Sequence, residues 1–142
     1  MKTYLDSSFL FSLYANDANS QAAFAEMARV PSAFVISTLT ELEFLNSLEL
    51  WLFRKRLSGA QADRVRVAFE QDLESAVYTE VELDPRVFRD TRKLILQFSA
   101  SVGCRTADIL HVSAALAAQC DKMYTFDLRQ RDLARRVKLP TN

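Results

Sequence analysis

The sequence of 142 residues contains few of the residues that the commonest cofactor and metal sites require. It has only two glycines, Gly59 and Gly103, so neither a GxGxxG fingerprint nor a phosphate-binding P-loop can be formed. Its two cysteines, Cys104 and Cys120, have no CxxC spacing and no histidine cluster nearby, which argues against a structural zinc site or a disulfide framework. We therefore expect two buried thiols, and we exclude the commonest nucleotide-binding enzymes.

Net charge and long apolar runs are absent as well. Eighteen basic and eighteen acidic side chains cancel, so any polyanion partner has to be met by a local patch. No apolar run approaches the roughly 20 residues that span a bilayer, and the start "MKTYLDSSFLFSLYA" lacks the apolar core and cleavage site of a signal peptide. We expect a cytoplasmic protein without membrane contact, folded as one compact domain over residues 1–142.

Short β-branched segments alternate with helical patterns along the chain. Strands are expected at residues 3–5, 34–37, 77–83 and 123–126. On the third strand, the side chains expected to share one face are Val77, Thr79, Val81 and Leu83. Because strands and helices take turns, the pattern predicts an α/β fold, with a parallel sheet covered by helices on both sides.

Three helical segments carry distinct signals. Residues 38–56 are apolar almost all round, which predicts a helix packed inside the core. A capping box formed by Ser58 and Gln61 opens the next helix, and Asp84 followed by a proline opens another. The apolar face of that last helix is expected to contain Phe88, Ile95, Phe98 and Val102.

Two acids stand at the ends of predicted strands. Asp6 follows the first strand and Asp127 follows the fourth. In an open parallel sheet, ligands bind beyond the carboxyl ends of the strands, near the point where the strand order reverses. If the first and fourth strands are neighbours, both carboxylates face one crevice.

Two further acids lie early in predicted buried helices. Thr106 is expected to cap a nearly all-apolar helix and to leave Asp108 in its first turn, where the helix dipole favours a carboxylate. Glu43 lies early in the helix of residues 38–56. A charged group at such a position is expected to point into a cleft.

Four carboxylates in one crevice repel one another by roughly 4 kcal/mol per pair at about 4 Å, for an effective dielectric of about 20. A hard divalent cation offsets this repulsion. Oxygen-only ligands favour Mg²⁺ or Mn²⁺, whereas zinc prefers histidine or cysteine. Such an ion lowers the pKa of a bound water and neutralises charge on a phosphoryl group, which points to phosphodiester hydrolysis.

The segments "TYLDSSFL", "ISTLTELEFLNSL", "RTADILHVSAALA" and "YTFDLRQRDLA" together resemble the PIN-domain ribonucleases, most closely the VapC toxins of toxin–antitoxin pairs. The likeness extends over essentially the whole chain. It implies a PIN-like three-layer α/β/α fold, with a central parallel sheet of four to five strands flanked by helices. It also implies an endoribonuclease that depends on Mg²⁺ or Mn²⁺ and cleaves RNA.

The resemblance also assigns residues and partners. The acidic cluster of the family corresponds to Asp6, Glu43, Asp108 and Asp127, which are therefore the expected catalytic and metal-binding residues. Ser7 and Ser8 correspond to small hydroxyl residues of the family, and Thr125 to a polar residue that orients a metal-bound water. A homodimer and a cognate antitoxin protein are the partners expected from the family.

One assignment among the acids has an alternative. Glu41 and Glu43 project about 200° apart on a helix, so only one of them faces the cleft. The family pattern places the acid six residues after Ser37, which favours Glu43, with Asn46 on the same face. Glu41 is the alternative. His111 is expected to be a hydrogen-bonded core residue outside the site.

Other features allow two interpretations. The arginines that either contact RNA or an antitoxin, or solvate a helix end, are Arg129, Arg131, Arg135 and Arg136. Trp51 and Phe53 belong either to the core or to an apolar patch that binds a partner. The functional alternatives are an inactive PIN-like module that binds RNA or protein, and a metal-dependent phosphatase. The phosphatase is disfavoured because "LDSSF" has Ser8 where the haloacid dehalogenase pattern has a second aspartate.

Overall fold

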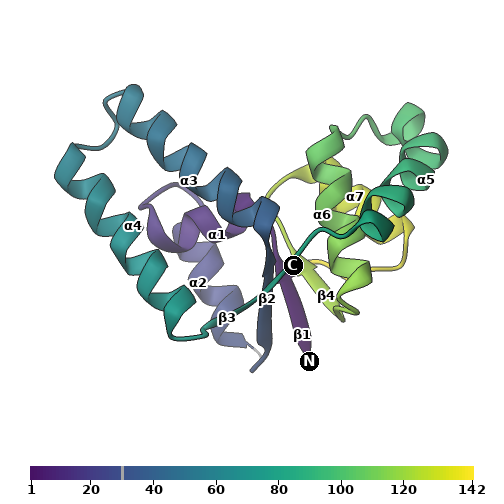
Figure 1. Cartoon of the computed structure of the whole chain (residues 1–142), viewed down its shortest axis with the longest axis horizontal. Helices are drawn as coiled ribbons and strands as arrows, with labels where there is room; N and C mark the ends of the chain where they lie inside the picture. Colours follow the sequence, from purple (N-terminus) through teal and green to yellow (C-terminus); the bar gives the residue numbers. More distant parts are fainter. Residues whose placement is uncertain (30) are drawn as a thin grey trace.

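A computed structural model of the protein describes residues 1–29 and 31–142. Within these residues, four parallel strands form one sheet in the order β3-β2-β1-β4 (Figure 1). The strands are β1 (Lys2–Leu5), β2 (Ala33–Ser37), β3 (Tyr78–Val81) and β4 (Lys122–Tyr124). The helices are α1 (Ser7–Tyr14), α2 (Ser20–Arg29), α3 (Thr38–Phe53), α4 (Gly59–Glu74), α5 (Pro85–Val102), α6 (Thr106–Ala117) and α7 (Leu128–Arg136).

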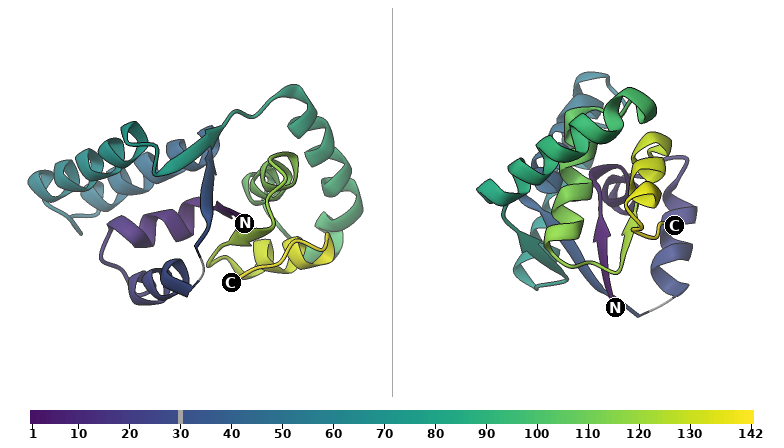
Figure 2. Two further views of the ribbon diagram at one scale, coloured as in Figure 1. Left: turned by 90° about the horizontal axis from the view of Figure 1, so that it is seen from below. Right: turned by 90° about the vertical axis from the view of Figure 1, so that its right-hand side faces the viewer.

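Helices cover both faces of the sheet, so the predicted three-layer α/β/α architecture is confirmed. Figure 2 shows α1 to α4 on one side of the sheet and α5 to α7 on the other. Strand side chains alternate between the two layers: Leu5 packs in the core beneath α1 to α4, whereas Tyr4 packs against α6 and α7. Each face therefore has its own apolar core.

The strand order reverses at β1. The chain runs from β1 through β2 to β3 and then returns to place β4 on the other side of β1, where Tyr4 pairs with both Val35 and Met123. The first and fourth strands are thus neighbours, which is the condition for Asp6 and Asp127 to face one crevice. At the outer edge of β4, Thr141 makes a bridge with Met123, so the C-terminal segment lies beside that strand.

The helix signals in the sequence are largely confirmed. Ser58 and Gln61 form the capping box of α4, and Asp84 caps α5 ahead of Pro85. Among the described residues, no helix combines the length and the hydrophobicity that crossing a membrane demands.

Parts of the predicted apolar faces of β3 and α5 are wrong. Val77 is exposed and Tyr78 is buried, because β3 is an edge strand that begins at Tyr78, opposite Phe34 of β2. Phe88 is 53% exposed, whereas Val87 of the same helix lies inside. The other three residues of the predicted α5 face pack against the core, as predicted: Ile95, Phe98 and Val102.

Helix α3 is not packed all round. It forms a hairpin with α4 that extends away from the sheet, so much of its surface has no neighbouring layer (Figure 1). Phe53 is 83% exposed. Trp51 is half-buried, with its ring 5.0 Å from that of Phe11 and with the guanidinium of Arg56 over it at 3.8 Å.

The thiols differ from the prediction in one respect. Cys120 is buried, but Cys104 is partly exposed, and its Sγ donates to the carbonyl of Arg129 at 3.3 Å. Both cysteines are free.

Candidate metal and RNA-cleavage site

Two of the four candidate acids are helix N-caps at the carboxyl end of the sheet. Asp6 ends the connection from β1 to α1, and its Oδ1 accepts the backbone N–H of Phe9 at 2.8 Å. Asp127 caps α7, and its Oδ1 accepts the backbone N–H of Gln130 at 2.9 Å. The N-terminal ends of the helix dipoles favour the ionised carboxylates at both positions. The fold therefore orients these two side chains locally.

Asp6 is almost completely buried, with 3% of its surface exposed. Its carboxylate accepts the hydroxyl of Ser8 at 2.9 Å and the hydroxyl of Thr125 at 2.7 Å. Burial raises its pKa, and His111 together with these hydrogen-bond donors offsets this only in part. The negative charge of Asp6 is thus held by neutral groups.

Thr125 connects Asp6 to Asp127. Its hydroxyl donates to Asp6 Oδ2 and accepts the backbone N–H of Asp127 at 3.0 Å. The sequence predicts that Asp127 follows the fourth strand directly. Because β4 ends at Tyr124, Asp127 instead lies beyond a connection of two residues. In this structure the Thr125 hydroxyl is committed to the two acids.

Glu43 points toward the same region from α3. Its Oε1 accepts the hydroxyl of Ser7 at 3.0 Å and contacts Nε2 of His111. Burial opposes ionisation of Glu43, but the contacts with His111 and Ser7, and the nearby Arg105, outweigh burial and lower its pKa. Glu41 lies instead beside Glu80 of β3. Of the two alternatives, Glu43 is therefore the one that the fold brings to Asp6.

Asp108 lies in the first turn of α6, as predicted, but Thr106 does not cap this helix. The N-cap position is Arg105, and Asp108 Oδ2 accepts its backbone N–H at 3.1 Å. The guanidinium of Arg105 also binds Asp108, with Nε to Oδ2 at 3.2 Å and Nη2 to Oδ1 at 3.4 Å. Gln130 Nε2 donates to the Asp108 carbonyl at 3.2 Å, which ties α6 to α7.

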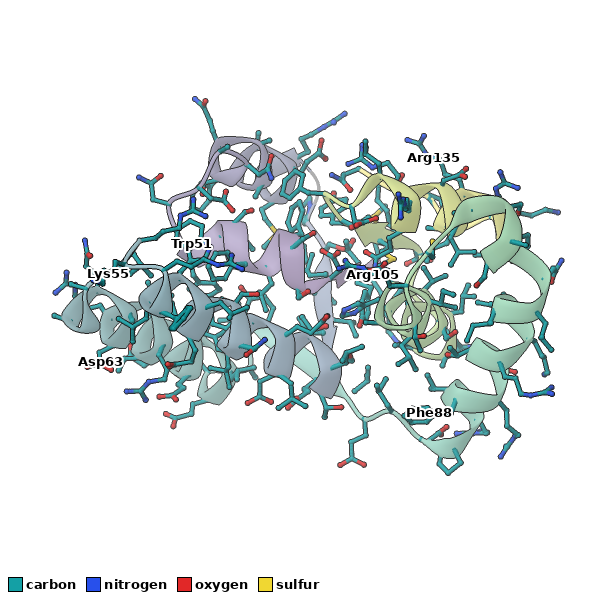
Figure 3. All side chains as sticks on the ribbon, turned by 90° about the horizontal axis from the view of Figure 1, so that it is seen from above. Trp51, Lys55, Asp63, Phe88, Arg105 and Arg135 are labelled. Atoms are coloured by element: carbon teal, nitrogen blue, oxygen red, sulfur yellow. The ribbon has the colours of Figure 1, made fainter. Side chains whose placement is uncertain are left out.

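Arg105 also reaches the fourth acid. Its Nη2 lies 3.9 Å from Asp127 Oδ2. Figure 3 shows Arg105 between the α1 and α3 side of the molecule and the α6 side. One arginine therefore supplies positive charge to Asp108 and Asp127 and lowers the pKa of Glu43 from a distance.

Two hollows meet at Arg105. One, of about 390 Å³, is lined by Glu43, Asn46, Ser7 and Ser8, so Asn46 shares the face of Glu43 as predicted. The other, of about 490 Å³, is lined by side chains that include Asp108 and Asp127. Three of the four acids thus line two hollows that share Arg105, and Asp6 lies buried beside Ser8, which lines the first of them.

The donor chemistry fits a hard divalent cation, because all four candidate ligands are carboxylates and two of them already share a positive charge. Their spacing is looser than that of a closed site. Within residues 1–29 and 31–142, no three histidine, cysteine or acidic side chains lie close enough to ligate one ion. Direct contact of one ion with three of these acids therefore requires side chains to rotate, with Arg105 moving away from between Asp108 and Asp127.

Two residues of the site were not predicted from the sequence. His111 is 1% exposed, but it contacts Glu43 and is not merely part of the core. The signal for a place near the acids was its position three residues after Asp108, which puts both residues on the same face of the helix. Arg105 lies three residues before Asp108, and this spacing was the corresponding signal for its contact with Asp108.

The arginines of α7 have partners within the chain. Arg129 donates to the carbonyl of Gly103 at 3.1 Å, and Arg131 donates to the carbonyl of Thr125 at 2.8 Å. Arg135 donates to the hydroxyl of Thr141, and Arg136 forms an ion pair with Asp132. These contacts favour the structural interpretation of the basic run over a free RNA-binding patch.

Comparison with known families identifies the fold. The family model of the PIN domain matches residues 3–136. This chain belongs to the PIN-domain family. The match covers the sheet, all seven helices named above and all four candidate acids of this PIN domain.

Solved structures of the same fold are distant in sequence. The VapC20 toxin of Mycobacterium tuberculosis, described as cleaving the sarcin–ricin loop, superposes with a TM-score of 0.70 at 16% identity, covering 94% of each chain. FitAcB of Neisseria gonorrhoeae has a TM-score of 0.70 at 15% identity, covering 98% of this chain and 95% of its own. VapBC2 of Rickettsia felis, bound to promoter DNA, has a TM-score of 0.67 at 12% identity, covering 100% and 98%. No curated protein matches the sequence.

Proposed function

We propose that this PIN domain is a metal-dependent endoribonuclease of the VapC type, which hydrolyses RNA phosphodiester bonds. The single observation that carries the proposal is that Asp6, Glu43, Asp108 and Asp127, from four separate segments of a PIN fold, are linked through Ser7, Ser8, Thr125, His111 and Arg105 at the carboxyl end of a parallel sheet. The residues that hold Mg²⁺ or Mn²⁺ in this proposal are these four acids.

The ion supplies a water of lowered pKa and offsets charge that develops on the phosphoryl oxygens. The protein supplies the fixed geometry. Asp6 is held by the backbone of Phe9 and by the hydroxyls of Ser8 and Thr125, so it is the most rigid of the four acids. Glu43 and Asn46 line the hollow beside it, where the scissile phosphate and its neighbouring nucleotides bind.

The proposed partners follow from the same likeness. Structures of this fold include VapBC and FitAB assemblies and a toxin–antitoxin complex from Klebsiella pneumoniae, which supports a cognate antitoxin protein for this chain. We propose a homodimer in the cytoplasm as the active form. The exposed apolar side chains of the α3–α4 hairpin, such as Phe53, are consistent with contact to a protein partner.

The proposal is tested by measuring cleavage of a structured RNA with Mg²⁺ or Mn²⁺, with a chelator, and with the Asp6→Asn variant. Cleavage should need the ion and should be lost in the variant, while asparagine keeps the cap of α1 and hence the fold. The same preparations are assayed for phosphate release from a small ester. Ester hydrolysis without RNA cleavage would favour the phosphatase, and binding without cleavage would favour an inactive module.

A further inference from the structure

A chain of buried hydrogen bonds leads from the N-terminus of α3 to Glu43. The Tyr4 hydroxyl lies 2.7 Å from Ser37 Oγ and 3.1 Å from Thr40 Oγ1, the two residues of the α3 capping box. It also lies 2.8 Å from Nδ1 of His111, and the other imidazole nitrogen contacts Glu43. Tyr4 is 0% exposed and His111 is 1% exposed, so water does not compete for the contact between them.

The roles of donor and acceptor follow from the ends of this chain. Glu43 Oε1 accepts the hydroxyl of Ser7 and contacts Nε2 of His111, and a carboxylate oxygen accepts hydrogen bonds, so the proton lies on Nε2. When the ring carries this one proton, Nδ1 is an acceptor and Tyr4 donates to it. Ser37 then donates to the Tyr4 oxygen, whereas the hydroxyl of Thr40 donates to the carbonyl of Leu5 at 3.4 Å. The arrangement therefore selects one tautomer of the imidazole.

The hydrogen bonds to Glu43 are one-sided. Those from Ser7 and His111 both reach Oε1, and among the described residues none reaches Oε2. The donors come from α1 and α6, while Glu43 belongs to α3, so three helices determine where the carboxylate lies. One oxygen is fixed by the protein, and the other is left for the hollow lined by Glu43 and Asn46.

We propose that Tyr4 and His111 are positioning residues for Glu43: Tyr4 fixes the Nε2–H tautomer of His111, which holds Oε1 of Glu43 and leaves Oε2 available to a cation. This inference rests on the proposed function for the metal, but the hydrogen-bonded arrangement itself does not. Outer partners of this kind typically change metal affinity by about 10- to 100-fold when they are removed.

The tautomer is measurable in the metal-free protein, because His111 is the only histidine of the sequence. A long-range proton–nitrogen NMR correlation, recorded above the ordinary pKa of histidine, should show Nε2 protonated and Nδ1 unprotonated. In Tyr4→Phe, which lacks the donor to Nδ1, the signals should shift toward a mixture of tautomers. A protonated Nδ1 in the wild type, or an unchanged spectrum in Tyr4→Phe, would overturn the proposal.

Metal affinity is measured by calorimetric titration with Mn²⁺ in three variants. His111→Leu should weaken binding by about 10- to 100-fold, and His111→Gln, which retains an N–H donor near the Nε2 position, should restore most of the loss. Thr91→Val is the matched control. It removes a buried hydrogen bond from Thr91 of α5 to Ser113, which lies on α6 as His111 does, and it does not touch Glu43. It should bind Mn²⁺ as the wild type does.

The outcomes separate the two levels of the argument. Equal affinities for the wild type and His111→Leu, or equal losses in His111→Leu and His111→Gln beside an intact control, would overturn the positioning role. Absence of Mn²⁺ binding by the wild type would contradict the proposed function, and the tautomer measurement would still decide whether Tyr4 directs His111. Circular dichroism of each variant identifies any that fails to fold, and Tyr4→Phe then carries the affinity test.

Discussion

The two sides of the candidate site hold their acids by different means. On the α1–α3 side, Asp6 and Glu43 accept hydrogen bonds from hydroxyl, backbone and imidazole groups. On the α6–α7 side, Asp108 and Asp127 share the guanidinium of Arg105. Each side combines one buried acid with one more accessible acid. Asp6 is buried and Glu43 is partly exposed, and 9% of the Asp108 side chain is exposed against 31% for Asp127.

The difference shows where negative charge is uncompensated. Burial raises the pKa of Asp6 despite several neutral donors, because hydrogen bonds replace only part of the hydration that the carboxylate loses. On the other side an arginine supplies a formal positive charge, but 78% of its side chain is exposed, so solvent screens the pair. A divalent cation bound between the two sides would compensate both.

The largest expected effect comes from neutralising either side. Asp108→Asn and Asp127→Asn should each lower RNA cleavage by about a hundredfold or more, as Asp6→Asn should, because loss of a ligand removes several kcal/mol of transition-state stabilisation. Cleavage rates at saturating Mg²⁺ measure this. Asp84→Asn, which changes the N-cap of α5 away from the site, is the control and should retain full activity. Full activity in Asp108→Asn would confine the site to the α1–α3 side.

Thr125→Val sharpens the comparison through stability. The substitution keeps the shape of the side chain but removes the hydroxyl that joins Asp6 to the backbone N–H of Asp127. Because it leaves buried groups without a partner, it should lower the free energy of unfolding by about 1–3 kcal/mol. Urea unfolding without metal measures the change. Thr106→Val, at an exposed position, should have almost no effect, and an unchanged stability in Thr125→Val would mean that the two sides are not coupled there.

Arg105→Gln tests the other side. Removing the guanidinium frees Asp108 and Asp127 for a cation, and because the ion pair is exposed the gain in Mn²⁺ affinity should be only about two- to fivefold. The control is Arg86→Gln, which breaks a comparable pair with Asp84 at the start of α5. Weaker Mn²⁺ binding in Arg105→Gln than in the control would show that Arg105 supports the ion rather than competing with it.

The smallest effect concerns Glu41, the alternative to Glu43 as the acid on α3. Burial and the neighbouring Glu41 raise the pKa of Glu80, so the stability that protonated Glu80 contributes is present below the ordinary pKa of glutamate and lost as pH rises through the raised value. In Glu41→Gln, the free energy of unfolding that is lost over this pH range should be smaller by less than about 1 kcal/mol, since Glu41 and Glu80 are at the surface. Melting temperatures across this pH range measure it. Mn²⁺ binding should be unchanged in Glu41→Gln, whereas Glu43→Gln should weaken it.

The sequence predicted the parts of the fold that local signals determine. The alternation of strands and helices, the caps at Ser58 and Asp84, and the placing of Asp6 and Asp127 after strands were recoverable. The order β3-β2-β1-β4 then brings the acids together, because it makes β1 and β4 neighbours. These features need only periodicity, capping chemistry and one topological rule.

What sequence reasoning missed depends on contacts between distant segments. Tyr4 and His111 are separated by 107 positions, and the side chain that each would meet is fixed only once the sheet has formed. The burial of Tyr78 in place of Val77 depends on where the edge strand begins, which propensity leaves uncertain by one residue. The exposure of α3 depends on a hairpin that extends beyond the sheet, and helical periodicity does not report its neighbours.

The most direct measurement is a calorimetric titration of Mn²⁺ into the wild-type protein, Asp6→Asn and Asp127→Asn under identical conditions. Asp6 comes after β1 and Asp127 comes after β4, so a cation that both bind needs each carboxylate. The wild type should therefore bind Mn²⁺, and both variants should lose this binding. Undiminished Mn²⁺ binding in either variant would contradict a cation shared across the switch point of the sheet.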